Sequence, residues 1–455
     1  MKTDQKTTDL NRRGFLRLTA GAAAGASALV MGPSLMPSKA RAQGADNHRF
    51  IFCAFDGGWD HLLSLDPRDP DVFTEARSQE TLIQLAWDRL AAQFQTGLIT
   101  PGGSNISFGP AIGDFARHFD VSCVVRGVSM DTLTHQVGMR YMNTGQLPAG
   151  LQATGSSIAT RIIAQQGELL PVPNLVSRFE TYNNAYPQFA SGLSVNGAGD
   201  LVLTLRDFPS APSPVIRNHL EAYRSRNGQC DPAQLDRGGI FGLIRGSMSK
   251  AREMVESDLA GYFDFAGDSQ EIVELRDRYG ISPQGLSGAT PAEQAATAYQ
   301  ALKHGVSQCV SMALVNGLDT HDDTWAASQA ETQQLGFNAL AQLVDDLKAD
   351  GTLAHTTIVV FSEFGRTAML NNREGRDHGL SNSILLIGAG VPHNRVIGGT
   401  NDVGLSPLSI DPNTGATISG EGTRLTPGNV LASVMQSNGY DGSSLRADPL
   451  PCLLT

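Results

Sequence analysis

Acidic and imidazole side chains gather just after three short apolar runs, at residues 50–55, 308–315 and 356–361. These side chains are Asp56, Asp319, His321, Glu363, Asp377 and His378. Carboxylates and imidazoles are ligands that Zn²⁺ and Mn²⁺ take in proteins, whereas Mg²⁺ and Ca²⁺ prefer an oxygen-dominated set. The sequence therefore predicts a divalent-metal site, with Zn²⁺ or Mn²⁺ favoured and Mg²⁺ or Ca²⁺ as alternatives.

Each of these groups also has an ordinary structural explanation. Asp56-Gly57-Gly58 is a common turn, and the stretch DTHDD at 319–323 could cap the start of a helix. Glu363 could simply pair with Arg366, and a single histidine is more often a hydrogen-bonded polar residue than a ligand. Clusters that each follow an apolar strand are harder to explain one by one, so we prefer the metal site.

The elements that must position these side chains alternate along the chain. Strand-like runs at 308–315 and 356–361 flank helical spacing at 326–349, and another helix is expected at 291–303. Further strands are expected at 50–55, 121–125 and 383–387. Continuous apolar strands that alternate with helices predict an α/β fold, a mainly parallel central sheet with helices on both faces. Ligands bind at the carboxyl ends of such strands, where the acidic and imidazole residues fall.

The first 42 residues read as an export signal. Paired arginines at Arg12 and Arg13 precede an Ala/Gly-rich apolar stretch, and Ala40-Arg41-Ala42 is a small-residue cleavage site. This order is typical of a secretory signal of the twin-arginine (Tat) type, and predicts a periplasmic or secreted protein that meets the Tat export machinery. A stable membrane anchor is disfavoured because glycines and two prolines interrupt the apolar run.

The remainder divides into a predicted α/β domain at 43–400 and a C-terminal loop and short helix at 401–455. A more polar, partly helical stretch at 180–290, with helix-like spacing at 238–263, is interpreted as an insertion or cap. In the C-terminal part, Thr426-Pro427 has the N-cap and N1 residues that open a helix.

Charge and cysteine usage narrow the choice of partner. Residues 1–42 carry seven Lys and Arg and two Asp, so the other 413 residues hold 27 basic and 43 acidic side chains, a net charge of −16. Such an acidic surface repels nucleic acid and anionic lipid, and an anionic substrate would need a local positive charge such as a metal ion. Five cysteines, several of them in apolar runs, favour buried thiols over a disulfide framework, with at most one or two disulfides.

Five motifs in this order resemble the exported domain of unknown function family 1501, within the alkaline phosphatase and sulfatase-like superfamily. They are FDGGWDHLLSLDPR, THQVGMRYMNTG, LDTHDDTW, FSEFGRT and GRDHG, and the resemblance covers most of residues 48–400. It implies an alkaline phosphatase-like sheet with a metal-dependent site at the strand ends. It also implies activity on phosphate or sulfate esters, whether of a small molecule or of a polymer.

The superfamily pattern carries over unevenly to the metal ligands. Asp56 matches the first metal-binding aspartate, and Asp319 with His321 matches the aspartate and histidine of one metal site, at a tighter spacing. Glu363-Phe364-Gly365 stands where the superfamily has Asp-His-Gly, so Phe364 leaves one ligand missing. The pair Asp377-His378 could supply a later ligand.

The nucleophile is less clear from the same resemblance. Counted back from Thr144, its position falls on His135, with Thr134 beside it, and no sulfatase-type Cys or Ser stands there. Thr134 could attack after metal-assisted deprotonation, whereas His135 could form a phosphohistidine-like adduct or bind metal. Arg366 and Arg376 would be anion clamps or orienting residues, with a surface salt bridge as the alternative for both.

Two functions follow from these residues. The first is an exported, metal-dependent hydrolase of phosphate or sulfate esters. The alternative is a non-catalytic exported protein of the same fold that binds metal or a polymer, which the residue at 364 and the ambiguous nucleophile favour.

Overall fold

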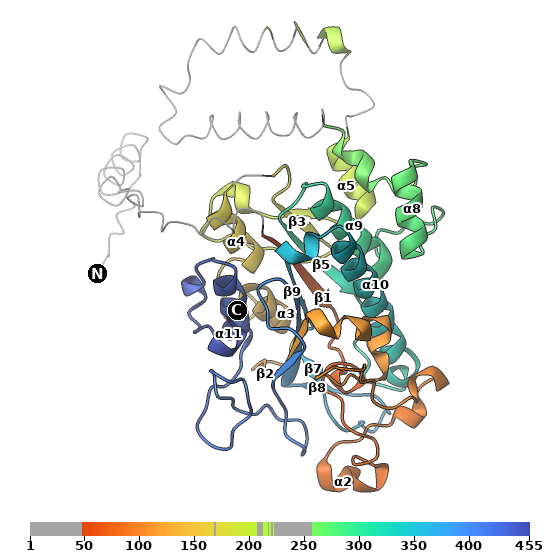
Figure 1. Ribbon diagram of the computed structural model, residues 1–455, viewed down its shortest axis with the longest axis vertical. Coiled ribbons are helices and arrows are strands. Elements are labelled where there is room, and N and C mark those ends of the chain that lie inside the picture. The colour runs from red at the N-terminus through yellow and green to blue at the C-terminus, as the bar shows by residue number, and fades with distance from the viewer. Residues whose placement is uncertain (1–47, 168–169, 207–212, 217, 220–221, 223–256) are drawn as a thin grey trace, which may run out of the picture. The chain divides into compact units, whose positions relative to one another are not determined.

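The computed structural model describes residues 48–167, 170–206, 213–216, 218–219, 222 and 257–455 (Figure 1). The predicted signal peptide lies outside these residues, as does most of the helix expected at 238–263, whose described end is a short 3₁₀ helix, η9 (Leu259–Phe263). An eight-stranded sheet in the order β10-β2-β9-β6-β1-β5-β3-β4 forms the centre of the fold. Its strands are β1 (Arg49–Phe55), β2 (Ser122–Ser129), β3 (Asn174–Ser177), β4 (Leu193–Val195), β5 (Cys309–Val315), β6 (Thr356–Phe361), β9 (Ser381–Gly388) and β10 (Arg395–Gly398).

The predicted α/β fold with a mainly parallel sheet is confirmed. Strand β1 pairs in parallel with β5 and β6, and β3 pairs in parallel with β5 and β4. Strand β9 runs antiparallel to both of its neighbours, β2 and β6, and it is the one reversed strand of this sheet. Because β6, β1 and β5 are adjacent and parallel, their carboxyl ends meet at one edge.

Helices cover both faces of the sheet, and the strand sequences explain why. Along β1, Ile51, Cys53 and Phe55 join one core cluster while the intervening residues join a second, since alternate side chains of a strand face opposite sides. The first cluster packs against α9 and α10, and the second packs against α3, α4 and α11 (Figure 1). A strand buried on both faces must be continuously apolar, which is the pattern of FIFCAF.

The helix predictions hold closely in the C-terminal half. The helix predicted at 291–303 is α9, and the one predicted at 326–349 begins as a π-turn at Trp325–Gln329 and continues as α10. Thr426 caps α11 through a capping box with Asn429, as the Thr-Pro pair predicts. Within the described residues, the α-helices are α2 (Ser78–Thr81), α3 (His135–Thr144), α4 (Ile158–Gln166), α5 (Ala198–Leu205), α8 (Gln270–Tyr279), α9 (Pro291–Lys303), α10 (Ala330–Ala349) and α11 (Pro427–Ser437).

The stretch at 180–290 is not wholly outside the sheet. Strand β4 lies within it and pairs with β3 at the edge of the sheet, while α5, η9 and α8 supply its helical part. No helix in the described part of the chain is long and apolar enough to cross a membrane. Four cysteines, Cys53, Cys123, Cys309 and Cys452, are buried free thiols, and Cys230 lies outside the described residues.

Candidate functional site

The turn after β1 brings two strand ends into direct contact. Gly57 has φ +114, and a Cβ there would lie 2.5 Å from the backbone nitrogen of Leu318, so only glycine fits. The backbone of Asp56 makes two hydrogen bonds at the end of β5. Its amide donates to the Val315 carbonyl at 2.8 Å, and its carbonyl accepts from the Leu318 amide at 3.2 Å. Asp56 and Asp319 are thereby fixed at the same edge of the sheet.

A helix brings His135 to the end of β6. Gly138 lies in the first turn of α3, and a Cβ there would come within 2.5 Å of the Glu363 carbonyl oxygen. The backbone of α3 therefore packs directly on residue 363, and His135, the first residue of the helix, reaches the Glu363 carboxylate with Nδ1 2.6 Å from Oε1.

A two-stranded ribbon returns the chain to this edge after β6. Strands β7 (Gly365–Arg366) and β8 (His378–Gly379) pair antiparallel, with Arg366 opposite His378. The loop between them holds Asp377 next to His321, with His321 Nδ1 2.8 Å from the Asp377 carboxylate. The polar residues after β6 thus lie beside those after β5.

The three histidines share one hydrogen-bonding pattern. In each imidazole, Nδ1 faces an acceptor: Glu363 for His135 at 2.6 Å, Asp377 for His321 at 2.8 Å, and the Leu133 carbonyl for His378 at 2.6 Å. A neutral imidazole carries its proton on one nitrogen, and a proton on Nδ1 of each ring leaves Nε2 as the nitrogen with the lone pair. This is the arrangement that orients metal-binding histidines in proteins.

The three Nε2 atoms converge on one oxygen, Oδ1 of Asp319. They lie 3.2 Å from it for His135, 3.0 Å for His321 and 3.3 Å for His378, and the Nε2 atoms of His321 and His378 are 2.9 Å apart. Nε2 of His135 is buried and makes no hydrogen bond to any described group. Ligands about 2.0–2.1 Å from a tetrahedral Zn²⁺ lie about 3.3 Å apart, and the distances from Asp319 Oδ1 to the Nε2 atoms match this spacing.

The donor atoms of three residues lie close enough together to bind one ion. The ligand atoms of His135, Asp319 and His378 all lie within 4.8 Å of one another, and His321 adjoins both of the last two. Two imidazole lone pairs facing each other at 2.9 Å repel unless a proton or a cation lies between them. The donor set therefore fits a divalent cation, and we call His135, Asp319, His321 and His378 the metal cluster.

Arg366 holds Asp319 in place from inside the protein. Its guanidinium is buried and donates to Asp319 at 2.7 Å, to the carbonyls of Leu318 and Gly58 at 2.9 and 2.8 Å, and to that of Gly57. Partial burial raises the pKa of Asp319, but Arg366 and His135 outweigh it and lower that pKa to about 2. The surface salt bridge considered for Arg366 is therefore wrong, because its side chain is fully buried and its donors are engaged.

Glu363 and Asp56 form a second acidic pair beside the cluster. Glu363 is fully buried and accepts hydrogen bonds from the Gly57 amide and the Ser362 hydroxyl, both at 2.9 Å, in addition to His135. Burial raises the pKa of Asp56 to about 6, and the neighbouring Glu363 carboxylate adds to the shift. Two carboxyl groups this close favour a proton or a cation nearby.

The other predicted site residues lie as follows. Asp377 contacts Nδ1 of His321, whereas Nε2 of the same ring faces Asp319. A carboxylate on the outer nitrogen of a metal-binding histidine orients its ring. Phe364, at the position of the missing ligand, packs its ring 4.8 Å from His135 and 4.4 Å from His378. Thr134 is exposed at the N-cap of α3, and its side chain makes no capping hydrogen bond.

Arg376 does not belong to this site. Its side chain is fully buried, 2.8 Å from the equally buried Asp60 carboxylate, and its guanidinium lies 4.8 Å from the centre of the Trp325 ring. Neither a surface salt bridge nor an anion clamp describes it, since it has no access to solvent.

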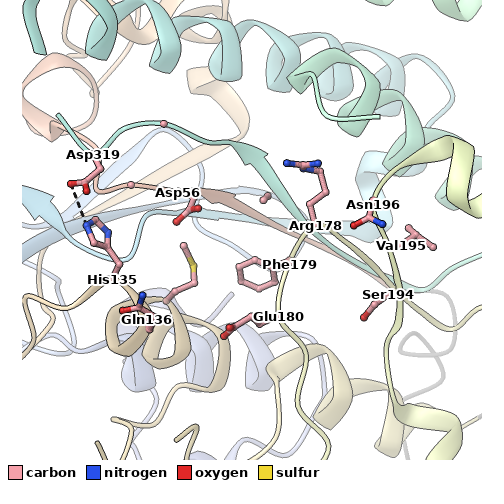
Figure 2. A pocket seen from close by; sticks show the side chains of 14 residues that line it. Asp56, His135, Gln136, Arg178, Phe179, Glu180, Ser194, Val195, Asn196 and Asp319 are labelled. Carbon is pink, nitrogen blue, oxygen red and sulfur yellow. Dashed lines mark ion pairs between the residues drawn. The ribbon is translucent and has the colours of Figure 1, made fainter. Parts of the chain in front are cut away.

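Two members of the metal cluster, His135 and Asp319, line a cleft of about 960 Å³. Figure 2 shows Asp56, His135 and Asp319 on its wall, with the ion pair between His135 and Asp319. Other lining residues, which the sequence reasoning missed, lie after β3 (Arg178, Phe179 and Glu180) and in or just after β4 (Ser194, Val195 and Asn196). Strand β3 has only four residues, and recognising it would have directed the same strand-end argument to Arg178.

The comparisons with known proteins place the chain in a family. Residues 47–412 match the model of the family described as "Protein of unknown function (DUF1501)", and the chain belongs to that family. No curated protein matches.

Three solved structures are similar at low scores. One, BT33494S-sulf, comes from work on the metabolism of multiple glycosaminoglycans by Bacteroides thetaiotaomicron; it is 10% identical, with 89% of this chain and 75% of that chain covered and a TM-score of 0.33. The lipoteichoic acid synthase LtaP from Listeria monocytogenes is 7% identical over 78% and 69%, with a TM-score of 0.32. Ps i-CgsB, in complex with k-i-k-neocarrahexaose, is 10% identical over 77% and 68%, with a TM-score of 0.31. No activity is carried over from them.

Proposed function

We propose that this chain is a metal-dependent hydrolase of phosphate or sulfate esters. One observation carries the proposal: three histidines have Nδ1 on an acceptor and turn Nε2 toward a single Asp319 oxygen, and His135 and Asp319 line a cleft. The resemblance to the alkaline phosphatase and sulfatase-like superfamily supplies the reaction class.

The chain's own residues have distinct roles in this proposal. His135, Asp319 and His378 would hold a divalent ion, and His321 adjoins Asp319 and His378 as a further donor. A bound divalent ion would polarise the ester and offset the negative charge that develops during hydrolysis.

Five further groups support these ligands. Glu363, Asp377 and the Leu133 carbonyl orient the three imidazoles, and Arg366 keeps Asp319 ionised and in place. Asp56 lines the same cleft and is the further acidic group available to substrate or cation.

The geometry bears on the nucleophile as well. His135 has Nδ1 engaged by Glu363 and Nε2 directed at Asp319, which supports a ligand role over a covalent adduct. Thr134 precedes it in the chain and its hydroxyl is exposed, so it is the hydroxyl we propose as the nucleophile. Thr134→Ala should then stop turnover without lowering metal content, whereas His135→Ala should lower both.

The proposal is tested by metal content and activity together. Protein purified without added metal should contain Zn²⁺ or Mn²⁺ by elemental analysis and should cleave 4-nitrophenyl phosphate or sulfate. Asp319→Asn should lose the metal and at least about a hundredfold in activity, because orienting partners alone account for 10–100-fold. The exposed Asp323→Asn, four residues away, is the matched control and should change neither.

Two results would count against this reading. An Asp319→Asn protein that keeps both metal and full activity would remove the site. Full metal occupancy without turnover across a panel of phosphate and sulfate esters would favour the alternative, a non-catalytic protein that binds metal or a polymer.

We also propose that the protein acts in the periplasm or outside the cell, after Tat export. The twin arginines and the Ala-Arg-Ala site support this. Mass analysis of the exported form should then place its N-terminus near Gln43, and an exported chain that retains residues 1–42 would contradict it.

A further inference from the structure

Arg178 lies at the carboxyl end of β3, on the wall of the cleft that His135 and Asp319 also line. It is exposed, and it lines the same cleft as His135 and Asp319 although it comes from a different strand end (Figure 2). None of the roles described above uses it. Its position is the strand-end position at which α/β sheets place ligand-binding groups.

The backbone at Arg178 is held in an unusual conformation. Its φ is +54, in the left-handed region that a long side chain rarely adopts, and its amide donates to Val195 of the neighbouring strand β4 at 2.9 Å. Strained backbone of this kind persists where the surrounding structure enforces it, and it is enriched at binding sites. The β3–β4 edge thus holds Arg178 toward the cleft.

The guanidinium of Arg178 has no partner among the described side chains, although an acidic residue lines the same cleft. Glu180 is already engaged: Arg140 donates to its two oxygens at 3.0 Å each, and the Tyr182 hydroxyl donates to it as well. Arg178 therefore contributes an uncompensated positive charge to the cleft. Among the described residues that line the cleft, Arg178 is the one Lys or Arg.

We propose that Arg178 binds a second anionic group of the substrate, a sulfate, phosphate or carboxylate that is not the reacting ester. This inference rests on the proposed function for the identity of the reacting group. A cleft of about 960 Å³ is far larger than a single phosphate or sulfate, so it has room for a substrate that carries two such groups. Arginine suits the role because its planar fork pairs with two oxygens of one anion.

Binding of matched probes tests the proposal. Glucose 6-phosphate and glucose 1,6-bisphosphate form one pair, and a monosulfated and a disulfated chondroitin disaccharide form the other; each is titrated into the full chain by calorimetry. The wild type should bind the probe with two anions about tenfold more tightly in at least one pair, the size of one hydrogen bond to a charged group. Arg178→Gln should remove that preference and leave binding of the single-anion probe unchanged.

Arg446→Gln is the matched control. Arg446 is also exposed and has φ +56, but it does not line the cleft, so its change removes the same charge from the same backbone conformation. It should bind both probes as the wild type does. Arg178→Lys should restore part of the preference, because the charge remains while the paired hydrogen bonds are lost.

The titrations are repeated after chelator treatment, which separates this inference from the proposed function. An Arg178-dependent preference in a protein that cleaves no ester even after Zn²⁺ or Mn²⁺ is added back would leave the inference standing and remove the hydrolase. Hydrolysis with equal binding of both probes in each pair, no binding of any probe, or a preference that survives Arg178→Gln would overturn the inference.

Discussion

The segment from Arg376 to His378 contributes to both a closed ion pair and an open metal cluster, and the two have opposite characters. In the closed pair, Asp60 and Arg376 are both fully buried, and the Asp60 carboxylate also accepts from the Trp325 indole at 2.9 Å and the Leu62 amide at 3.1 Å. We call Asp60, Arg376 and Trp325 the buried brace. In the metal cluster, Asp319 has a side chain that is 49% exposed and faces three imidazoles.

The difference lies in unused bonding capacity rather than in residue type. The other nitrogens of the Arg376 guanidinium donate to the carbonyls of Thr367, Gln84 and Leu85, so no part of it can bind a ligand. Two residues later in the chain, His378 uses one nitrogen on a carbonyl and leaves the other facing Asp319. A polar cluster binds ligands where lone pairs remain after its internal hydrogen bonds are made.

The largest effect is expected from breaking the buried brace. Asp60→Asn leaves the Arg376 charge buried without its partner, which costs about 3–5 kcal/mol of unfolding free energy. Urea unfolding should show this loss, while the metal content of the folded fraction stays at the wild-type level. Stability within about 0.5 kcal/mol of the wild type would show that the brace contributes little, since that is the range of an ordinary surface change.

A smaller effect is expected at the metal cluster, where metal affinity should change and stability should not. Asp377→Asn removes the carboxylate that orients His321, so metal affinity should fall about 10–100-fold while the metal-free protein keeps its stability. Competition with a metal indicator measures the metal affinity, and urea unfolding in the presence of a chelator measures the stability of the metal-free protein. Glu374→Gln, an exposed residue of the same loop that pairs with Arg89, should change neither. Unchanged affinity in Asp377→Asn would exclude an orienting role.

The smallest effect is expected from pH at a second closed group. Burial raises the pKa of Asp66, but Arg126 and Arg68 outweigh it and hold the pKa below its usual value. Because the folded-state pKa lies below the unfolded one of about 3.9, the stabilisation is present above that pH and is lost as pH falls through the folded-state value.

Urea midpoints measured from about pH 5 down to about pH 2 should therefore decline more steeply in the wild type than in Asp66→Asn. Asp402→Asn is the control, because Asp402 pairs with the same Arg68 from an exposed position and should leave the slope unchanged. Equal slopes for the wild type and Asp66→Asn would contradict the coupling between Asp66 and its arginines.

Local pattern was a reliable guide where elements are long and uniform. The strand predicted at 356–361 and the helix predicted at 291–303 coincide with β6 and α9, because continuous burial and helical spacing are written into their sequences. Strands β3 and β4, with four and three residues, are too short to show a period, so the cleft wall that holds Arg178 was missed. The reversed direction of β9 likewise depends on its neighbours, β2 and β6.

For the site, the sequence by itself determined which polar side chains follow the strands, because that order is a property of the chain. Asp56, Asp319 and Glu363 follow adjacent parallel strands, so they reach one edge. Only the tertiary structure decided that Arg366 and Arg376 turn inward while Nε2 of His135 makes no hydrogen bond to the described groups, since the partners of these side chains come from distant segments. A side chain's remaining bonding capacity is set by the neighbours it meets after folding, and local sequence does not contain them.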